Sequence, residues 1–303
     1  MPSDQWHLTE DLDGFLTGAG DFLRSRPDVH LMPLTVIARL RAGTYTLAPG
    51  QSVLYGRLES GGEVRGVCYR LPGRGLGITP LTPGQADGLA GRLADLGLDL
   101  PYVSCDRDTA VAFAAAWRRR TGATASLRVE LRLHRLGTLT PPDPLPAGRG
   151  RGAGDADLGR VVDWCRGFAE DVGEPVTITT DTWPDTRFAD KTYTFWETPD
   201  GTPVSIAGAN PPVAGVVQID PVYTPAHLRG HGYAAAATAA ACETARAEGA
   251  TGLVLFTDAA NPTSNALYHR LGFRVLDEWA VYDFTAAAPD PDPSTPDSVT
   301  ATA

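Results

Sequence analysis

The stretch Gly215–Gly249 constrains the fold of this chain more than any other. It reads GVVQIDPVYTPAHLRGHGYAAAATAAACETARAEG. A run rich in β-branched residues reaches Pro225, a short turn with two glycines follows, and an alanine-rich helix runs to the last glycine. The glycines let the backbone bend tightly and approach a ligand, and the unpaired N–H groups at a helix start attract an anion. The stretch therefore predicts a phosphate site, to which Arg229 adds a forked cation.

Two motifs in and after this stretch resemble those of one protein family. The turn reads R-x-x-G-x-A at Arg229, Gly232 and Ala234, which resembles the acyl-CoA pyrophosphate loop of the GNAT superfamily of N-acetyltransferases. Residues 252–257 resemble the strand that follows this helix in the family. Residues 261–273 (NPTSNALYHRLGF) resemble its closing segment, N-x-x-x-x-x-L-Y-x-x-x-G-F. Each motif lies in the expected local context, and the resemblance covers about 155–285.

The resemblance implies an α/β fold of the acyl-CoA N-acyltransferase type, in which helices flank a mixed sheet. The first part of the chain shows a similar order of elements, which suggests a tandem duplication whose first copy has decayed. Proline and glycine dominate a segment between the two copies that has no apolar periodicity. We therefore expect a degenerate domain over 1–136, a linker over 137–154, a catalytic domain over 155–285 and a disordered tail over 286–303.

Local patterns predict the individual elements. The prolines at 80 and 83 interrupt the segment after Arg74-Gly75-Leu76-Gly77, so we interpret 71–78 as an ordinary loop and not as a second phosphate site. We expect helices within 1–30 and over 34–42, 83–96, 106–120 and 155–170, a hairpin over 52–59 and 64–70, strands over 100–105 and 126–135, a second hairpin over 192–197 and 203–207, and a final strand over 274–284.

Composition and charge narrow the function classes. The chain has 303 residues, enough for two domains, and a formal net charge of −10, which argues against sequence-independent binding of nucleic acid. The sequence has no apolar run long enough for a membrane span, and the acidic start of the chain is unlike a signal peptide, so a cytoplasmic protein is expected. The four cysteines are far apart, so we expect reduced, mostly buried thiols and no metal site.

The resemblance implies a set of donor-binding residues for acetyl-CoA as cosubstrate. The pyrophosphate would be held by the loop, and the pantetheine by free backbone groups where one strand splays from its neighbour. Asn261 would contact the pantetheine or stabilise its loop, and the Tyr268 phenol, with a pKa of about 10, would protonate the leaving thiolate. Alternatively, Tyr268 packs between helix and sheet without a chemical role. The loop residues are Arg229, Gly230, His231, Gly232, Tyr233 and Ala234, and the splayed residues are Val222, Tyr223 and Thr224.

The residue that deprotonates the acceptor amine is less clearly marked. Asp220 precedes the splayed strand end and Asp258 follows the opposing strand, so both are candidate bases, together with Glu197 and His227. Each of these aspartates fits a turn position equally well, and a water-relayed deprotonation is a further alternative. Trp183, Arg187 and Phe188, in the polar loop before the sheet, are candidates for the acceptor pocket.

These features lead to one leading hypothesis and several rivals. The leading hypothesis is an N-acetyltransferase that moves an acetyl group from acetyl-CoA to the primary amine of a small molecule by direct attack in a ternary complex, as a monomer or homodimer. The first rival is a non-catalytic acyl-CoA-binding sensor or scaffold, which has no need for Tyr268. The others are acyltransferases that use a longer acyl-CoA or a protein amine.

Overall fold

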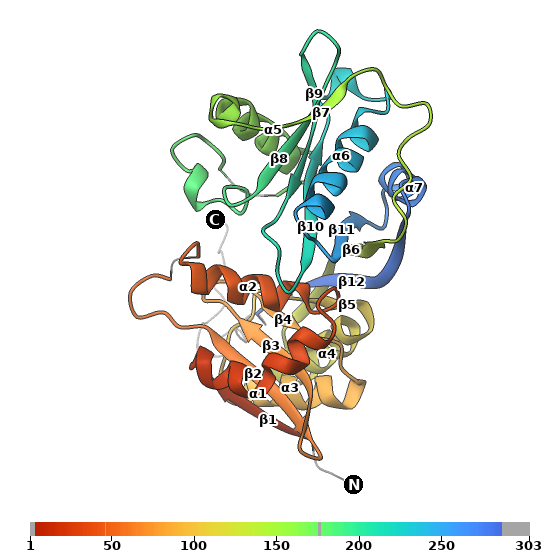
Figure 1. Cartoon of the computed structure of the whole chain (residues 1–303). Coiled ribbons are helices and arrows are strands. Elements are labelled where there is room, and N and C mark those ends of the chain that lie inside the picture. The colour runs from red at the N-terminus through yellow and green to blue at the C-terminus, as the bar shows by residue number, and fades with distance from the viewer. Residues whose placement is uncertain (1–3, 46, 175–176, 287–303) are drawn as a thin grey trace, which may run out of the picture.

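A single twelve-stranded mixed sheet runs through both parts of the chain, with helices on its two faces (Figure 1). The computed structural model describes residues 4–45, 47–174 and 177–286, so all but Ala286 of the predicted tail lies outside the described residues. The strand order is β1-β2-β3-β4-β5-β12-β6-β11-β10-β9-β8-β7. The predicted α/β class, with helices flanking a mixed sheet, is confirmed.

The first half, up to residue 136, forms the lower part of the molecule in Figure 1. Two of its helices end at the predicted glycines: Gly43 follows α2 and Gly122 follows α4, and both have the left-handed backbone conformation. Asp106 caps the start of α4, as predicted, by accepting a hydrogen bond from the N–H of Thr109. The elements are β1 (Gln5–Thr9), α1 (Leu12–Ser25), α2 (Leu31–Ala42), β2 (Leu54–Ser60), β3 (Glu63–Arg70), β4 (Leu76–Ile78), α3 (Pro83–Asp95), β5 (Tyr102–Asp106), α4 (Arg107–Thr121) and β6 (Thr124–Leu136).

The second half repeats this order with one helix fewer before its hairpin. Short 3-10 turns stand at 155–157, 183–185 and 226–228, and the last of these leads into the glycine turn before α6. The elements are β7 (Arg149–Gly152), α5 (Leu158–Asp171), β8 (Thr192–Glu197), β9 (Pro203–Ala209), β10 (Val216–Tyr223), α6 (Tyr233–Ala247), β11 (Gly252–Asp258), α7 (Pro262–Arg270) and β12 (Phe273–Thr285).

The two halves exchange their last strands. β12, from the second half, lies between β5 and β6 of the first half, and β6 lies between β11 and β12. The two strands pair with each other in antiparallel orientation from Phe273 opposite Leu136 to Thr285 opposite Thr124. Each half is therefore completed by a strand of the other, and the main-chain hydrogen bonds of the sheet run through both.

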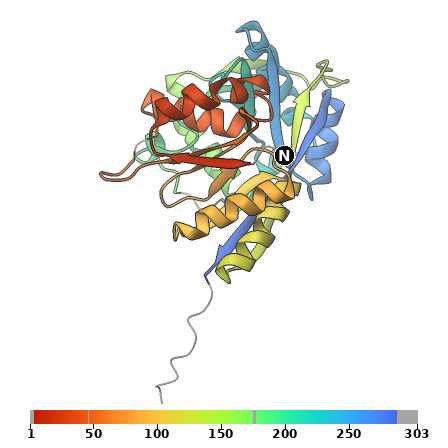
Figure 2. The same ribbon diagram turned by 90° about the horizontal axis from the view of Figure 1, so that it is seen from below.

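The helices cover opposite faces of the sheet in a regular way. In the first half α3 and α4 pack on one face and α1 and α2 on the other (Figure 2). In the second half α6 packs on Val217 and Ile219 of β10, while α5 packs on the other face, against Phe195 and Ile206. Since side chains alternate along a strand, Gln218 and Asp220 face away from α6.

Three short strands lie where the sequence predicts other structure, two of them at the edges of the sheet. β1 lies within the stretch predicted as helical, β4 within the predicted loop 71–78, and β7 within the predicted linker. Each is short, and β1 and β7 are the two edge strands, which pair only with β2 and β8. Their sequences, QWHLT and RGRG, carry little alternation because main-chain pairing with a neighbour, not burial of one face, holds them in place.

No described helix is long and apolar enough to cross a membrane. All four cysteines are free and buried, as the sequence predicts.

The alanine-rich composition of α6 has a steric cause. A Cβ added to Gly150 of β7 would lie 2.6 Å from the Cβ of Ala240 on α6. Helix and edge strand therefore approach so closely that neither position has room for a larger side chain.

We predict that Gly150→Ala lowers the free energy of unfolding by about 1–3 kcal/mol, because the added methyl forces β7 away from α6. The matched control is Gly152→Ala in the same strand, where an added Cβ meets nothing within 4 Å. Urea denaturation of both variants measures the difference. Equal midpoints for the two variants would contradict the close packing of β7 on α6.

Candidate active site

The start of α6, the predicted phosphate site, has no side-chain cap. Gly230 and Gly232 have φ values of 83° and 80°, which glycine adopts without strain, and Gly232 is the N-cap residue with no side chain to bond the first helical N–H groups. A Cβ added at Gly230 would meet nothing within 4 Å, and one at Gly232 would meet only Pro146 of the linker at 3.8 Å and 3.9 Å. The concavity therefore fits a diphosphate, with the positive end of the helix dipole behind it.

The side chains of this loop turn away from the concavity. Arg229 donates through Nε to the carbonyl of Thr224 at 2.9 Å and pairs with Asp171 at the end of α5. Its guanidinium therefore links the end of β10 to α5. The sequence instead predicts that this cation lies at the phosphate. The His231 ring donates to the Arg229 carbonyl at 2.9 Å and stacks on Tyr233 with centroids 5.5 Å apart.

The expected splay between two parallel strands is present. β10 pairs with β11 only from Val216 to Gln218, opposite Gly252 to Val254. β10 then bulges between Ile219 and Val222, while β11 continues along β6 as far as Asp258. A gap therefore opens between β10 and β11 beyond Gln218, and the edge of β10 that faces it has no strand partner.

The three predicted pantetheine residues line the end of β10 at this gap. Val222 and Tyr223 keep their pairing with Ala207 and Ile206 of β9 on the other edge. The Val222 side chain packs toward the α6 cluster, whereas the Tyr223 ring packs toward α5. Thr224 is buried, and its hydroxyl bonds that of Ser205 at 2.8 Å. The backbone of this segment is thus held from both faces while one edge stays free.

Tyr268 lies on α7 with 9% of its surface exposed and packs edge-on against Phe273, with ring centroids 5.9 Å apart. Its hydroxyl takes part in none of the hydrogen bonds among the described residues. Burial raises the pKa of Tyr268, and the charges of Asp220 and Cys242 raise it further. The phenol is therefore protonated at neutral pH. Tyr268 belongs to the same apolar cluster as Ile219 and Val222 of β10, which flank the bulge.

Asp220 is held as an ion and not as a base. Its carboxylate pairs with Lys191 at 2.9 Å and with Arg187. Burial alone would raise the pKa of Asp220, but the charges of Lys191 and Arg187 outweigh burial and lower it. A carboxylate with a lowered pKa is a weak proton acceptor at neutral pH.

Asp258 and Asn261 serve the turn between β11 and α7. The exposed Asp258 accepts from the N–H of Ala260 at 2.8 Å, and Asn261 caps α7 by accepting from Ser264 at 3.0 Å. These contacts match the turn interpretation of Asp258. Of the other candidate bases, Glu197 is buried against Arg151, and His227 is exposed in the turn before the glycine loop.

A polar network from the first half holds the start of α7. His134 of β6 is buried, and its Nε2 donates to the hydroxyl of Thr257 at 2.9 Å, which donates to Asn265 at 2.7 Å. Asn265 in turn donates to the carbonyl of Asn261 at 2.7 Å. Burial lowers the pKa of His134, so the ring is neutral, and Nδ1 has no partner among the described residues. The sequence motifs of the second half give no sign of this contribution.

A cavity of ≈270 Å³ lies on the face of β10 opposite α6, between the two halves. The helix α2, which lies along the boundary in Figure 1, contributes Thr35, Ala38 and Arg39 to one wall. Arg187, Lys191 and Asp220 contribute to the other.

Of the three residues proposed for the acceptor pocket, only Arg187 lines this cavity. Trp183 and Phe188 are buried in the core beneath α5 instead. They were predicted from their place in a polar loop, but their large apolar rings pack inward.

The equivalent helix start in the first half is closed. Thr82 caps α3 with its side chain by accepting from the N–H of Gln85, whose side chain accepts from the N–H of Thr82. Pro83 removes one further donor. The α3 start therefore offers an anion fewer free N–H groups than the α6 start does.

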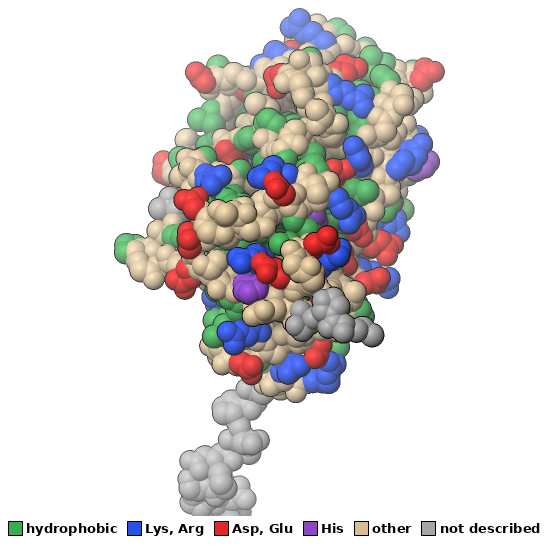
Figure 3. All heavy atoms as spheres, turned by 60° about the horizontal axis from the view of Figure 1, so that its bottom comes forward, with side chains coloured by type: hydrophobic (Ala, Val, Ile, Leu, Met, Phe, Trp, Pro, Cys, Tyr) green, Lys and Arg blue, Asp and Glu red, His purple; other side chains and the backbone are tan. Residues whose placement is uncertain are grey.

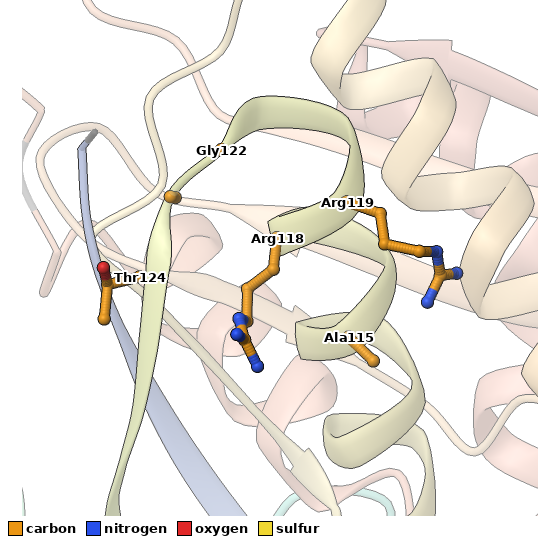
Figure 4. Close-up of a pocket in the computed structure, with 6 residues that line it drawn as sticks. Ala115, Arg118, Arg119, Gly122 and Thr124 are labelled. Carbon is orange, nitrogen blue, oxygen red and sulfur yellow. The ribbon is translucent and has the colours of Figure 1, made fainter. Parts of the chain in front are cut away.

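Other surface features do not resemble a catalytic site. An open depression at the end of α4 carries Arg118 and Arg119, which project to different sides of the helix (Figure 4). Arg119 pairs with Asp87 at 2.8 Å, and the lining includes no carboxylate, cysteine or histidine. On the face in Figure 3, basic and acidic side chains are interspersed and form no extended patch of one sign.

Residues 168–273 match the model of the Acetyltransferase (GNAT) family. A search of curated protein sequences found no match to the chain. The family match includes the glycine loop, the gap between β10 and β11, and α7.

Three solved structures are similar over most of the chain. The tandem GNAT protein from the clavulanic acid biosynthesis pathway, solved without AcCoA, is 15% identical with a TM-score of 0.55, covering 95% of this chain and 100% of that chain. The GCN5-related N-acetyltransferase from Sphaerobacter thermophilus is 16% identical (TM-score 0.56; 84% of this chain, 87% of that one). The GNAT-family acetyltransferase from Colwellia psychrerythraea is 11% identical (TM-score 0.53; 93% and 100%). At these identities the similarity concerns the fold, and the predicted fold is confirmed.

We predict that Gly232→Glu abolishes binding of acetyl-CoA, because a side chain and a negative charge enter the anion-binding concavity. The matched control is Gly62→Glu in the β2–β3 turn, where φ is 82° and an added Cβ meets nothing within 4 Å. Both variants carry the same backbone strain and the same charge. Calorimetric titration with acetyl-CoA separates them, and normal affinity in Gly232→Glu would show that the donor lies elsewhere.

Proposed function

Because the C-terminal part of the chain is a GNAT acetyltransferase domain, we propose that the protein is an acetyl-CoA-dependent N-acetyltransferase acting on the primary amine of a small molecule. One observation carries the proposal: the open, glycine-capped start of α6 adjoins a gap between β10 and β11, with the Tyr268 phenol nearby. This combination supports donor binding and chemistry in one place.

The residues at this gap fit the proposed donor. The N–H groups from Gly230 to Ala234 would hold its pyrophosphate, and the free edge of Val222–Thr224 would pair with the amides of its pantetheine arm. Bound acetyl-CoA supplies a thioester, whose carbonyl carbon accepts the amine. A free N–H on the same edge of β10 would stabilise the oxyanion that develops, an effect of a few kcal/mol for a preorganised donor.

Tyr268 has a defined part in this proposal. Its raised pKa lies above that of a thiol, which is about 8.5, so complete proton transfer from phenol to thiolate is uphill. We therefore assign the hydroxyl as a hydrogen-bond donor to the leaving sulfur, and the proton that finally neutralises the sulfur comes from the attacking amine. Its lack of a partner among the described residues leaves the hydroxyl available for this contact.

The state of the cysteines favours direct attack of the amine on the thioester over a mechanism with a cysteine acyl-enzyme intermediate. Burial raises the pKa of Cys242 to about 12, and that of Cys165 likewise. A nucleophilic cysteine needs the thiolate, which both positions disfavour. Deprotonation of the amine by water fits the site better than deprotonation by Asp220, whose carboxylate is held by Lys191 and Arg187.

The first experiment is calorimetric titration of the protein with acetyl-CoA, free CoA and a longer acyl-CoA. We expect acetyl-CoA to bind at one site per chain, since the equivalent helix start in the first half, that of α3, is capped by Thr82. A second site would show that the first half also binds donor. Absence of binding by all three donors would overturn the proposed function. Preference for the longer acyl-CoA would mean that the protein transfers a longer acyl group than acetyl.

We predict that Tyr268→Phe lowers kcat about 10-fold to 100-fold and leaves the Kd of acetyl-CoA unchanged, because only the hydrogen bond to the leaving sulfur is lost. Tyr282→Phe on β12, in the other half of the sheet, serves as the control. Release of CoA thiol in the presence of an accepted amine gives kcat. If Tyr268→Phe turns over at the normal rate, the rival function as a binding module gains support.

We predict that Asp220→Asn lowers the free energy of unfolding by about 3–5 kcal/mol, because Lys191, only 3% exposed, is left with a buried and poorly compensated charge. Thermal denaturation measures the loss. The double variant Asp220→Asn, Lys191→Met should recover part of it, since the buried cation is gone. A fully stable Asp220→Asn variant with a shifted pH–rate profile would instead identify Asp220 as the base.

A further inference from the structure

We propose that the acceptor is a small amine that also carries a carboxylate, such as an amino acid, and that Arg39 of the first half binds this carboxylate. The inference rests on the proposed function and identifies the substrate class of the same site. It concerns the cavity between α2 and β10, whose volume of ≈270 Å³ is slightly below the roughly 300–1,000 Å³ typical of drug-sized ligands. The cavity therefore fits a compact acceptor.

The cavity lies beside the part of β10 at which the gap begins. Gln218 and Asp220 line it from β10, and these residues stand where the pairing of β10 with β11 ends. The alternate residues Val217 and Ile219 face α6 on the opposite side. An amine in the cavity thus approaches the gap from one face while the α6 start holds the donor from the other.

Most of the charges in the cavity already have partners. Arg187 donates to Glu174 at 2.7 Å and to Asp220, and Lys191 donates to Asp220 at 2.9 Å and to Asn210. Both cations bond the same oxygen, Oδ2 of Asp220. Its Oδ1 has no hydrogen bond among the described residues and remains free to accept from the N–H of an amine.

Arg39 is the cation of this cavity that makes no side-chain hydrogen bond among the described residues, although it forms an ion pair with Asp190, which also lines the cavity. Its Nε lies 3.2 Å from Asp190 without the geometry of a hydrogen bond, and this buried nitrogen has no partner among the described residues. None of the hydrogen bonds among those residues uses the rest of its guanidinium. The Arg39 side chain is 23% exposed, and a buried nitrogen such as its Nε is costly to leave without a hydrogen bond. The forked donors of the guanidinium match a carboxylate.

These two free groups select the acceptor. A single molecule satisfies both groups if its amine donates to Asp220 and its carboxylate pairs with Arg39. A polycation would instead place a positive charge beside the guanidinium. The formal net charge of −10 for the whole chain therefore does not indicate which ligand charge the cavity prefers. Since Arg39 belongs to α2, the first half would select the substrate that the second half acetylates.

The test compares amino acids with their carboxamides and decarboxylated amines as acceptors, by release of CoA thiol. We expect kcat/KM to favour the carboxylate by about tenfold to a hundredfold, the effect of one charge-assisted pair. In Arg39→Gln this preference should fall to within about twofold, while the Kd of acetyl-CoA stays unchanged. Equal use of all three classes, or a preference that survives Arg39→Gln, would overturn the inference and leave the proposed function standing.

Two further variants separate recognition from structure. Arg41→Gln on the same helix removes an exposed cation that pairs with Asp13 and lies outside the cavity lining, and it should keep the preference. Asp190→Asn breaks the same ion pair as Arg39→Gln but leaves the guanidinium, so it should also keep the preference. If Asp190→Asn lost the preference as fully as Arg39→Gln, the ion pair and not carboxylate recognition would explain both, and the inference would fail.

A second measurement decides the case in which no amine in the panel reacts. N-acetylated amino acids, the expected products, are titrated into the protein loaded with CoA. The inference is supported if at least one product binds and its Kd rises about tenfold or more in Arg39→Gln. If no product binds, the inference fails. Absence of binding by acetyl-CoA itself, in contrast, overturns the proposed function.

Discussion

The antiparallel pairing of β6 with β12 is the interaction on which the rest of the structure depends. Each strand belongs by sequence to one half and is embedded in the sheet of the other. This exchange puts His134 beneath α7, where its bond to Thr257 helps to fix the turn before Tyr268. It also brings α2 of the first half against the face of β10. The site motifs are thus local in sequence, but their geometry is set by both halves.

The two halves show how small a change distinguishes an open helix start from a capped one. Both have a helix that follows a strand at the same place in the sheet. At α6 the cap residue is Gly232, which leaves the first N–H groups free, and at α3 it is Thr82, whose hydroxyl bonds the helix itself. A side-chain cap stabilises a helix by about 1 kcal/mol, and it competes with an anion for the same donors.

Local chemistry made much of the fold, and the open backbone at the α6 start, predictable. The glycine turn, the Asp106 cap, the Gly122 stop and the hairpins were predictable because a few adjacent residues determine each of them. Edge strands such as β7 were not, since pairing alone holds them. The place of Arg39 was not predictable either, because α2 and β10 are far apart in the sequence and only the assembled sheet brings them together. The burial of Trp183 and Phe188 likewise depends on a core that the loop sequence does not reveal.

The strand exchange also bears on how such a chain evolves. A duplicated domain is ordinarily free to be lost once its own ligand site has decayed. Here the loss of the first copy would remove β6 and expose the long edges of β11 and β12, which are ready to pair with other chains. The second half therefore needs the first half to complete its sheet. The surface of the first half meanwhile remains free to acquire new contacts with the ligand of its neighbour.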